Sequence, residues 1–227
     1  MYLTDKFGKP TVPTKPVDRD EPQMGVRDGF THFTSNPPAM VQLLKERLPL
    51  PVRLEGEIAV PFPAPETKFR FGGLYVGERA WPGGPVDHHS AVWLYVVPCA
   101  DAGRASGRSI ESRCQLFRWA AAGPLSRSDF WKGKTDWGRD PKEDAEPRFV
   151  PIVLDIHPDA LHATIDGVPY PPITAQAIQG RLRDDANDDP RFAAYPYAQP
   201  VLGDGIGITL NDTELIVRNL RLSRPDR

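Results

Sequence analysis

The chain is poor in the features that mark disulfide-rich, nucleic-acid-binding and membrane-spanning proteins. Its 227 residues include two cysteines, and 28 basic against 30 acidic side chains give a net charge of −2. Two cysteines are too few for a disulfide scaffold or a zinc cage. A near-neutral chain also lacks the basic face that nucleic acid requires, and the longest apolar run, Ala91 to Val97, is too short to span a bilayer. We therefore expect no nucleic-acid partner and no membrane span.

Targeting and redox signals are equally sparse. No charged-then-apolar leader opens the chain, so no signal peptide is visible and the compartment stays open. Cys99 and Cys114 each lie in an apolar run, which is typical of buried thiols. A disulfide between neighbouring strands is the alternative, because strand register cannot be read from the sequence. With 26 prolines and 19 glycines, the chain holds too many helix breakers for a helical bundle.

What the sequence does contain is a series of strand patterns. Residues Val52 to Val60 alternate between apolar and polar side chains, which is the period of a half-buried strand. The run Ala91 to Val97 is apolar on both faces, as a central strand between two covered faces should be. Further strands are expected at Lys68–Val76, Ser112–Ala120, Val150–Ile156, Leu161–Ile165, Ile206–Leu210 and Glu214–Leu222. These patterns predict an all-β, antiparallel two-sheet jelly-roll sandwich.

The domain organisation is indicated by where the strand patterns begin and where they are interrupted. Residues 1–24 are rich in proline and predict a flexible arm, and residues 25–227 predict a single β-sandwich domain. Two long loop insertions, 124–148 and 170–204, interrupt the strands. Within the second, Thr174 to Arg183 is a helix candidate, with Thr174 as its cap. Met40 to Leu48 suits either a helix or a strand, and the β context favours a strand at Met40–Leu44.

Several motifs resemble one fold family. The glycine-flanked run Gly203 to Ile208, followed by Leu215 to Leu222 with its Arg218-Asn219-Leu220-Arg221 core, resembles the last two strands of concanavalin A-like lectins and glucanases. The likeness is greatest to laminin G-like and 3-keto-disaccharide hydrolase-type domains. Asp166-Gly167 looks like their hairpin turn. Asp28-Gly29-Phe30 is similar to the start of these domains, and Leu54 to Ile58 looks like one of their early strands. The resemblance implies a sandwich that takes carbohydrate as its ligand and, by analogy alone, an extracytoplasmic place.

Aromatic and charged residues of the central strands are the candidate ligand-binding groups. Trp93 and Tyr95 share one face of the strand Ala91–Val97. On the next strand four residues share one phase and could join them: Glu111, Arg113, Gln115 and Trp119. An aromatic ring beside convergent polar groups is how a protein holds a sugar ring. The alternative is that Trp93 and Tyr95 fill the core. Arg53 is a further ligand-binding candidate, and three tryptophans on expected loops could rim the same face: Trp81, Trp131 and Trp137.

Two acidic groupings are weaker candidates for chemistry. Glu55 and Glu57 lie two residues apart on one strand face, which brings two carboxylates within the range that glycoside hydrolysis uses. Asp184, Asp185 and Asp188 offer oxygen ligands for calcium, without the spacing of a known calcium loop. No cofactor other than calcium is expected.

Three functions remain open at this stage. The first is a non-catalytic ligand-binding module, with carbohydrate as the ligand that the resemblance implies. The second is a glycoside-acting hydrolase of the same fold that uses Glu55 and Glu57 as its acid–base pair. The third is a protein-interaction or structural domain of a larger protein, with its partner unidentified. Fold alone does not choose among them.

Overall fold

The computed structural model describes residues 22–35, 39–44, 47–60, 70–81, 88–100, 108–120, 123–136, 148–188 and 200–225. Within them the elements are β1 (Gln23–Arg27), β2 (Phe30–Ser35), β3 (Ala39–Leu44), β4 (Val52–Ala59), β5 (Phe71–Trp81), β6 (His88–Ala100), β7 (Arg108–Ala120), β8 (Gly123–Asp136), β9 (Val150–Ile156), β10 (Ala160–Ile165), β11 (Val168–Pro169), β12 (Ile173–Thr174), α1 (Ala175–Asp188), β13 (Ile206–Asn211) and β14 (Thr213–Ser223).

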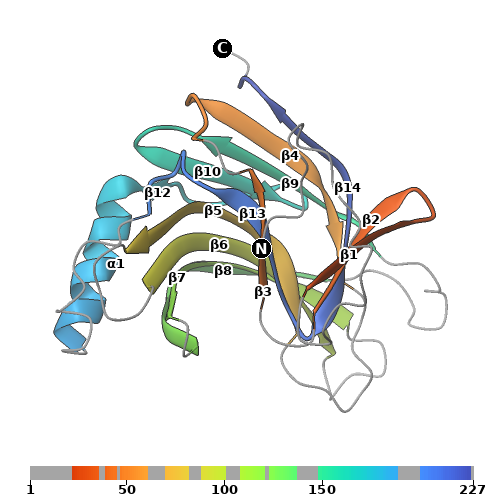
Figure 1. The fold of residues 1–227 in the computed structure, drawn as a ribbon, viewed down its shortest axis with the longest axis horizontal. Helices are drawn as coiled ribbons and strands as arrows, with labels where there is room; N and C mark the ends of the chain where they lie inside the picture. Colours follow the sequence, from red (N-terminus) through yellow and green to blue (C-terminus); the bar gives the residue numbers. More distant parts are fainter. Residues whose placement is uncertain are drawn as a thin grey trace.

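The strands form two stacked antiparallel sheets, as Figure 1 shows. One sheet has the order β1-β2-β14-β4-β9-β10-β11, with β12 also paired to β10. The other sheet has the order β3-β13-β5-β6-β7-β8. In Figure 1 strands β5 and β6 arch so that the concave side of this second sheet is turned away from the first. The expected two-sheet jelly-roll sandwich is confirmed.

Alternating side chains on β6 explain why that strand is apolar throughout. Val92, Leu94 and Val96 point into the main core between the sheets, and each is at most 1% exposed. Trp93 and Tyr95 point to the concave side and belong to a second buried cluster. Both faces of β6 are therefore covered, and for this reason the strand is apolar throughout instead of alternating between apolar and polar side chains.

The hairpin turns use the residues that the sequence pattern singled out. Asp166 and Gly167 have φ values of 53° and 76°, and Asp28 and Gly29 have values of 54° and 80°. Two successive positive φ angles define a type I′ turn, whose twist matches that of the strands it joins. The turn expected at Asp166-Gly167 is confirmed.

Helix α1 lies at one end of the sandwich, next to β12 (Figure 1). The hydroxyl of Thr174 accepts a hydrogen bond from the backbone N–H of Ala177 at 3.0 Å, so the expected cap is confirmed. Ile178 and Leu182 are buried in the main core. The helix continues to Asp188, five residues beyond its expected end, and Asp185 on this extension lies 3.8 Å from the buried guanidinium of Arg118.

Other differences from the expectations lie at segment boundaries. The first half of the expected insertion 124–148 is strand, because β8 pairs with β7 along nearly its whole length. Strand β1 begins at Gln23, inside the expected arm, whose residues 1–21 lie outside the described part of the chain. The strand expected at Met40–Leu44 is confirmed as β3. In the described part of the chain, no helix has the length and apolar character that crossing a bilayer demands.

Candidate functional site

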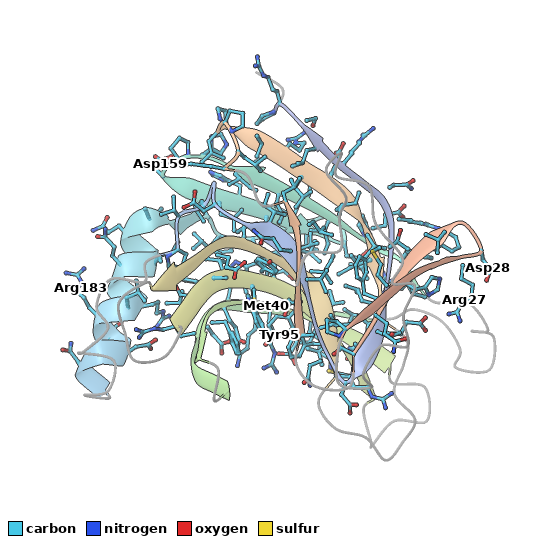
Figure 2. The ribbon with its side chains drawn as sticks, viewed as in Figure 1. Arg27, Asp28, Met40, Tyr95, Asp159 and Arg183 are labelled. Carbon is cyan, nitrogen blue, oxygen red and sulfur yellow. The ribbon has the colours of Figure 1, made fainter. Side chains whose placement is uncertain are left out.

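The concave face of the six-stranded sheet carries a cluster of aromatic side chains. Trp93 and Tyr95 from β6 pack with three further rings, Phe71, Tyr75 and Phe117. The rings of Trp93 and Phe117 are stacked with centroids 3.6 Å apart, and Figure 2 shows Tyr95 and Met40 on this side of the sheet. Trp93 and Tyr95 are only 2% and 1% exposed. They therefore face away from the main core, as the alternation predicted, but neither presents an open ring to solvent.

Polar side chains continue the same face toward the sheet edge. Strand β7 aligns Gln115 with Trp93 and Arg113 with Tyr95 across one strand boundary. Across the next boundary it aligns Gln115 with Asp129 and Arg113 with Lys132. We call the following five residues the polar strip: Glu111, Arg113, Gln115, Asp129 and Lys132. The strip lies on β7 and β8, the last two strands of the sheet. Its inner end, at Gln115, is buried, and its outer end, at Lys132, is exposed.

Hydrogen bonds tie the strip to the aromatic cluster. The hydroxyl of Tyr95 donates to Oε1 of Gln115 at 2.7 Å, and Nε2 of Gln115 donates to Asp129 at 2.5 Å. Asp129 also accepts from Lys132 at 2.8 Å. Beside this chain, Nε of Arg113 donates to Glu111 at 2.6 Å. The strip is thus a pre-ordered array of donors and acceptors resting on buried rings.

The charges of the strip are stabilised by these bonds. The hydrogen bond to Glu111, partly offset by burial, raises the pKa of Arg113. Burial opposes the charge of Asp129, but hydrogen bonds from Lys132 and Gln115 outweigh it, so the pKa of Asp129 lies below its usual value. Glu111 and Asp129 lie among three cations of the same face, Arg113, Lys132 and Lys134, so charges of both signs are mixed there and largely cancel.

The structure brings together some of the predicted ligand-binding residues and separates others. Trp93, Tyr95, Glu111 and Arg113 share one face, as their phase predicted. The side chain of Trp119 lies outside the described part, as does Trp137. Arg53 does not join the group, because it lies on β4 of the opposite sheet and donates twice to Asp155, at 2.7 and 2.8 Å. The ligand-binding roles remain predictions.

Of the three tryptophans expected to rim this face, Trp131 is the one whose side chain is described, and it does not lie on the rim. Trp131 lies in strand β8, not on a loop, and packs into the main core at the sheet edge. Trp81 ends strand β5, and its side chain lies outside the described part.

Sequence reasoning placed Gln115 in phase with Glu111 and Arg113 but missed Asp129 and Lys132. These two residues gave no signal, because a register shift between Cys114 and Gln115 decides which β8 residues reach the concave face.

Glu55 and Glu57 lie on the opposite, outer face of the eight-stranded sheet. Arg218 donates two hydrogen bonds to Glu57, at 2.8 and 2.9 Å, and the Asn219 amide donates a third at 3.0 Å. Arg221 donates to Glu55. The bonds from Arg218, opposed by burial, hold the pKa of Glu57 below its usual value. A glycosidase general acid needs a raised pKa, and the pKa of Glu57 moves the other way.

The acidic run and the cysteines can also be placed. Asp184 and Asp185 lie on α1, and the side chain of Asp188 is outside the described part. The described residues contain no group of three acidic, histidine or cysteine side chains arranged to hold a metal. Cys99 and Cys114 do not form a disulfide with each other, because Cys114 points into the main core while Cys99 packs against the concave-side cluster.

Comparisons with known proteins give matches in solved structures alone. No protein-family model matches the chain, and no curated protein matches it either. The carbohydrate-binding module CBM66 from Bacillus subtilis is 9% identical, with 89% of this chain and 92% of that one covered and a TM-score of 0.43. A Bacillus subtilis protein of unknown function with a galectin-like fold is 15% identical, with 89% and 86% covered and a TM-score of 0.45.

A family 16 endo-glucanase from Bacteroides ovatus is 10% identical, with 86% of this chain and 71% of that one covered and a TM-score of 0.39. Likenesses this distant say nothing about what the chain binds. The two stacked antiparallel sheets are the sandwich that the resemblance to concanavalin A-like lectins and glucanases implied.

Proposed function

We propose that this β-sandwich binds a neutral oligosaccharide along the polar strip of its concave face and does not cleave it. The observation that carries the proposal is the bonded chain from Tyr95 through Gln115 and Asp129 to Lys132, with Arg113 and Glu111 beside it. Sugar hydroxyls both donate and accept hydrogen bonds. A surface of fixed amide, carboxylate and cationic groups matches that chemistry without further ordering on binding.

The exposure of the strip supports binding at its outer end. The side chains of Lys132 and Asp129 are 50% and 35% exposed, whereas Gln115 is 5% exposed. A ligand therefore meets Lys132, Asp129, Arg113 and Glu111 first, while Gln115 and Tyr95 hold them in place from below. Because charges of both signs are mixed on this face, we favour a neutral ligand over an anionic one. The lowered pKa of Glu57 on the outer face is the opposite of what a general acid needs.

Isothermal titration calorimetry with soluble gluco-, galacto- and fructo-oligosaccharides tests the proposal. We expect one of these three classes of oligosaccharide to bind, and we expect Arg113→Ala to weaken that binding at least tenfold. Arg53→Ala is the matched control, because Arg53 is also a partly buried arginine bonded to a carboxylate, but on the opposite sheet. Near-ultraviolet circular dichroism checks that both variants keep their fold. If no oligosaccharide binds at millimolar concentration, or Arg113→Ala binds as well as the native chain, the proposal is wrong.

A further inference from the structure

A groove lies between the two sheets, on the opposite side of the six-stranded sheet from the polar strip. Its volume is about 470 Å³, which is within the usual range of small-molecule sites. Strands β3 and β13 form one wall, and β2, β4 and β14 of the other sheet form the opposite wall. Eight of the twelve residues that line this inter-sheet groove are apolar, and none of the twelve is acidic.

The inter-sheet groove is open because β2 accompanies β14 over only part of its length. Strand β2 pairs with β14 from Thr213 to Val217, whereas β4 pairs with β14 as far as Ser223. In Figure 1 the β1–β2 hairpin turns away from the upper part of β14. Among the described residues, 218–223 therefore have no neighbouring strand on that side, and the space between the sheets is accessible there.

One wall of the groove carries an uncovered apolar side chain. Leu222 lies opposite Leu54 on the neighbouring strand, so both side chains are on the same side of the sheet. Leu54 is 2% exposed and belongs to the main core, whereas Leu222 is 39% exposed. Leu44 and Leu220, which also line the groove, are only partly buried. A ligand with an apolar body would remove this surface from water.

The free edge of β14 does not suit an extended peptide as that ligand. A register shift between Arg218 and Arg221 forms a bulge, in which Asn219 has a φ of 54°. A bulge breaks the regular row of backbone donors and acceptors that an added strand would need. An alkyl chain needs no hydrogen bonds from its site, so the groove favours an alkyl chain over a peptide.

Two arginines line the groove, and one of them has donors to offer. Arg218 donates twice to Glu57 and lies 3.8 Å from the centroid of the Phe149 ring, so it is already engaged. Arg221 is 73% exposed and donates to Glu55 through Nε. No described residue holds its two terminal amino groups, and a guanidinium forms paired hydrogen bonds with a carboxylate.

We propose that the inter-sheet groove binds a single-chain fatty acid, with the alkyl chain against Leu44, Leu220 and Leu222 and the carboxylate on Arg221. The apolar lining selects the chain, and the exposed guanidinium selects an anionic head group over a neutral or cationic one. This site is independent of the polar strip, because the six-stranded sheet separates the two.

Isothermal titration calorimetry with decanoate, decanol and decyltrimethylammonium tests the proposal. The three compounds share one alkyl chain and differ in the charge of the head group, and all are used below the concentration at which they form micelles. We expect the Kd of decanoate to be at least fivefold below that of decanol, and decyltrimethylammonium to bind more weakly than either. Octanoate lacks two methylene groups, so its Kd should be about tenfold above that of decanoate.

Two pairs of variants test the chain and the head group separately. Leu222→Asp puts a carboxylate on the groove wall and should raise the Kd of decanoate at least tenfold. Val168→Asp makes a similar change at another exposed apolar residue, outside the groove, and should bind like the native chain. Glu55→Gln combined with Arg221→Gln should abolish the preference for decanoate over decanol, whereas Glu55→Gln alone keeps the guanidinium and should keep the preference.

Near-ultraviolet circular dichroism checks that each variant keeps its fold, and Arg113→Ala in the polar strip should bind decanoate normally. The proposal is overturned if decanoate shows no saturable binding, which is the result expected if a peptide or another segment of this chain occupies the groove. It is also overturned if decanol binds as tightly as decanoate, or if Leu222→Asp binds as well as Val168→Asp.

Discussion

The aromatic ring of Tyr75 lies directly on the backbone of Gly207, its partner on the neighbouring strand β13. A Cβ built at Gly207 would fall 2.4 Å from Cε1 of Tyr75 and 2.3 Å from the carbonyl oxygen of Val41. Contacts this short do not occur between real atoms, so glycine is required here. The Tyr75 ring in turn covers the backbone of β13 at Gly207, and this contact holds the aromatic cluster against the sheet.

Gly207→Ala should therefore lower the free energy of unfolding by about 2 kcal/mol, the usual cost of overpacking a core. Urea denaturation followed by tryptophan fluorescence measures it. Gly25→Ala on β1 is the control, since a Cβ there meets nothing within 4 Å. That variant should be neutral or slightly more stable, and equal losses in the two variants would contradict the close contact with Tyr75.

The pair Glu57–Arg218 predicts a pH dependence of stability. Because the pKa of Glu57 is lowered in the folded protein, the folded state favours the carboxylate. This contribution is present above the unfolded-state pKa and is lost as the pH falls through the folded-state pKa. Glu57→Gln should cost about 1 kcal/mol at pH 7, discounted for the partial exposure of the pair.

Thermal unfolding between pH 7 and pH 2.5 measures that difference, which should shrink as the pH falls below about 4. Glu55→Gln is the matched control, because its partner Arg221 is 73% exposed and the pair is screened by water. A loss in Glu57→Gln that does not vary with pH would show that the carboxylate is not the stabilising group.

The cap of α1 gives a third prediction. Thr174→Ala removes the acceptor for the Ala177 N–H and should cost about 1 kcal/mol of stability. Thr174→Ser keeps the hydroxyl and should restore most of it. Chemical denaturation compares the two variants with the native chain, and equal stability of the alanine and serine forms would contradict the cap.

The two thiols should differ sharply in reactivity. Burial raises the pKa of Cys114 well above its usual value, and a nearby Asp129 adds to that shift. At pH 8 a disulfide reagent such as Ellman's should therefore modify Cys99 slowly and leave Cys114 unmodified until the protein is unfolded. Two equivalents released from the folded chain would contradict the burial of Cys114, and none after unfolding would indicate a disulfide.

The sandwich could be predicted from the residues alone, because the patterns that indicate it are local. The alternation in Val52 to Val60, the two apolar faces of Ala91 to Val97 and the Asp166-Gly167 turn each reflect the geometry of a few consecutive residues. Within one strand, the shared face of Trp93 and Tyr95, and likewise that of Glu111 and Arg113, was visible for the same reason, since side chains two residues apart share a face.

Which of these groups lie close together depends on the three-dimensional fold. Arg53 was a ligand-binding candidate in the sequence, but it lies on the other sheet. Asp129 and Lys132 reach the polar strip through a register shift that no local pattern reveals. Strand alternation fixes a face but not the sheet to which that face belongs. Pairing between distant segments settles that choice, because it depends on the hydrogen bonds and packing of the whole chain.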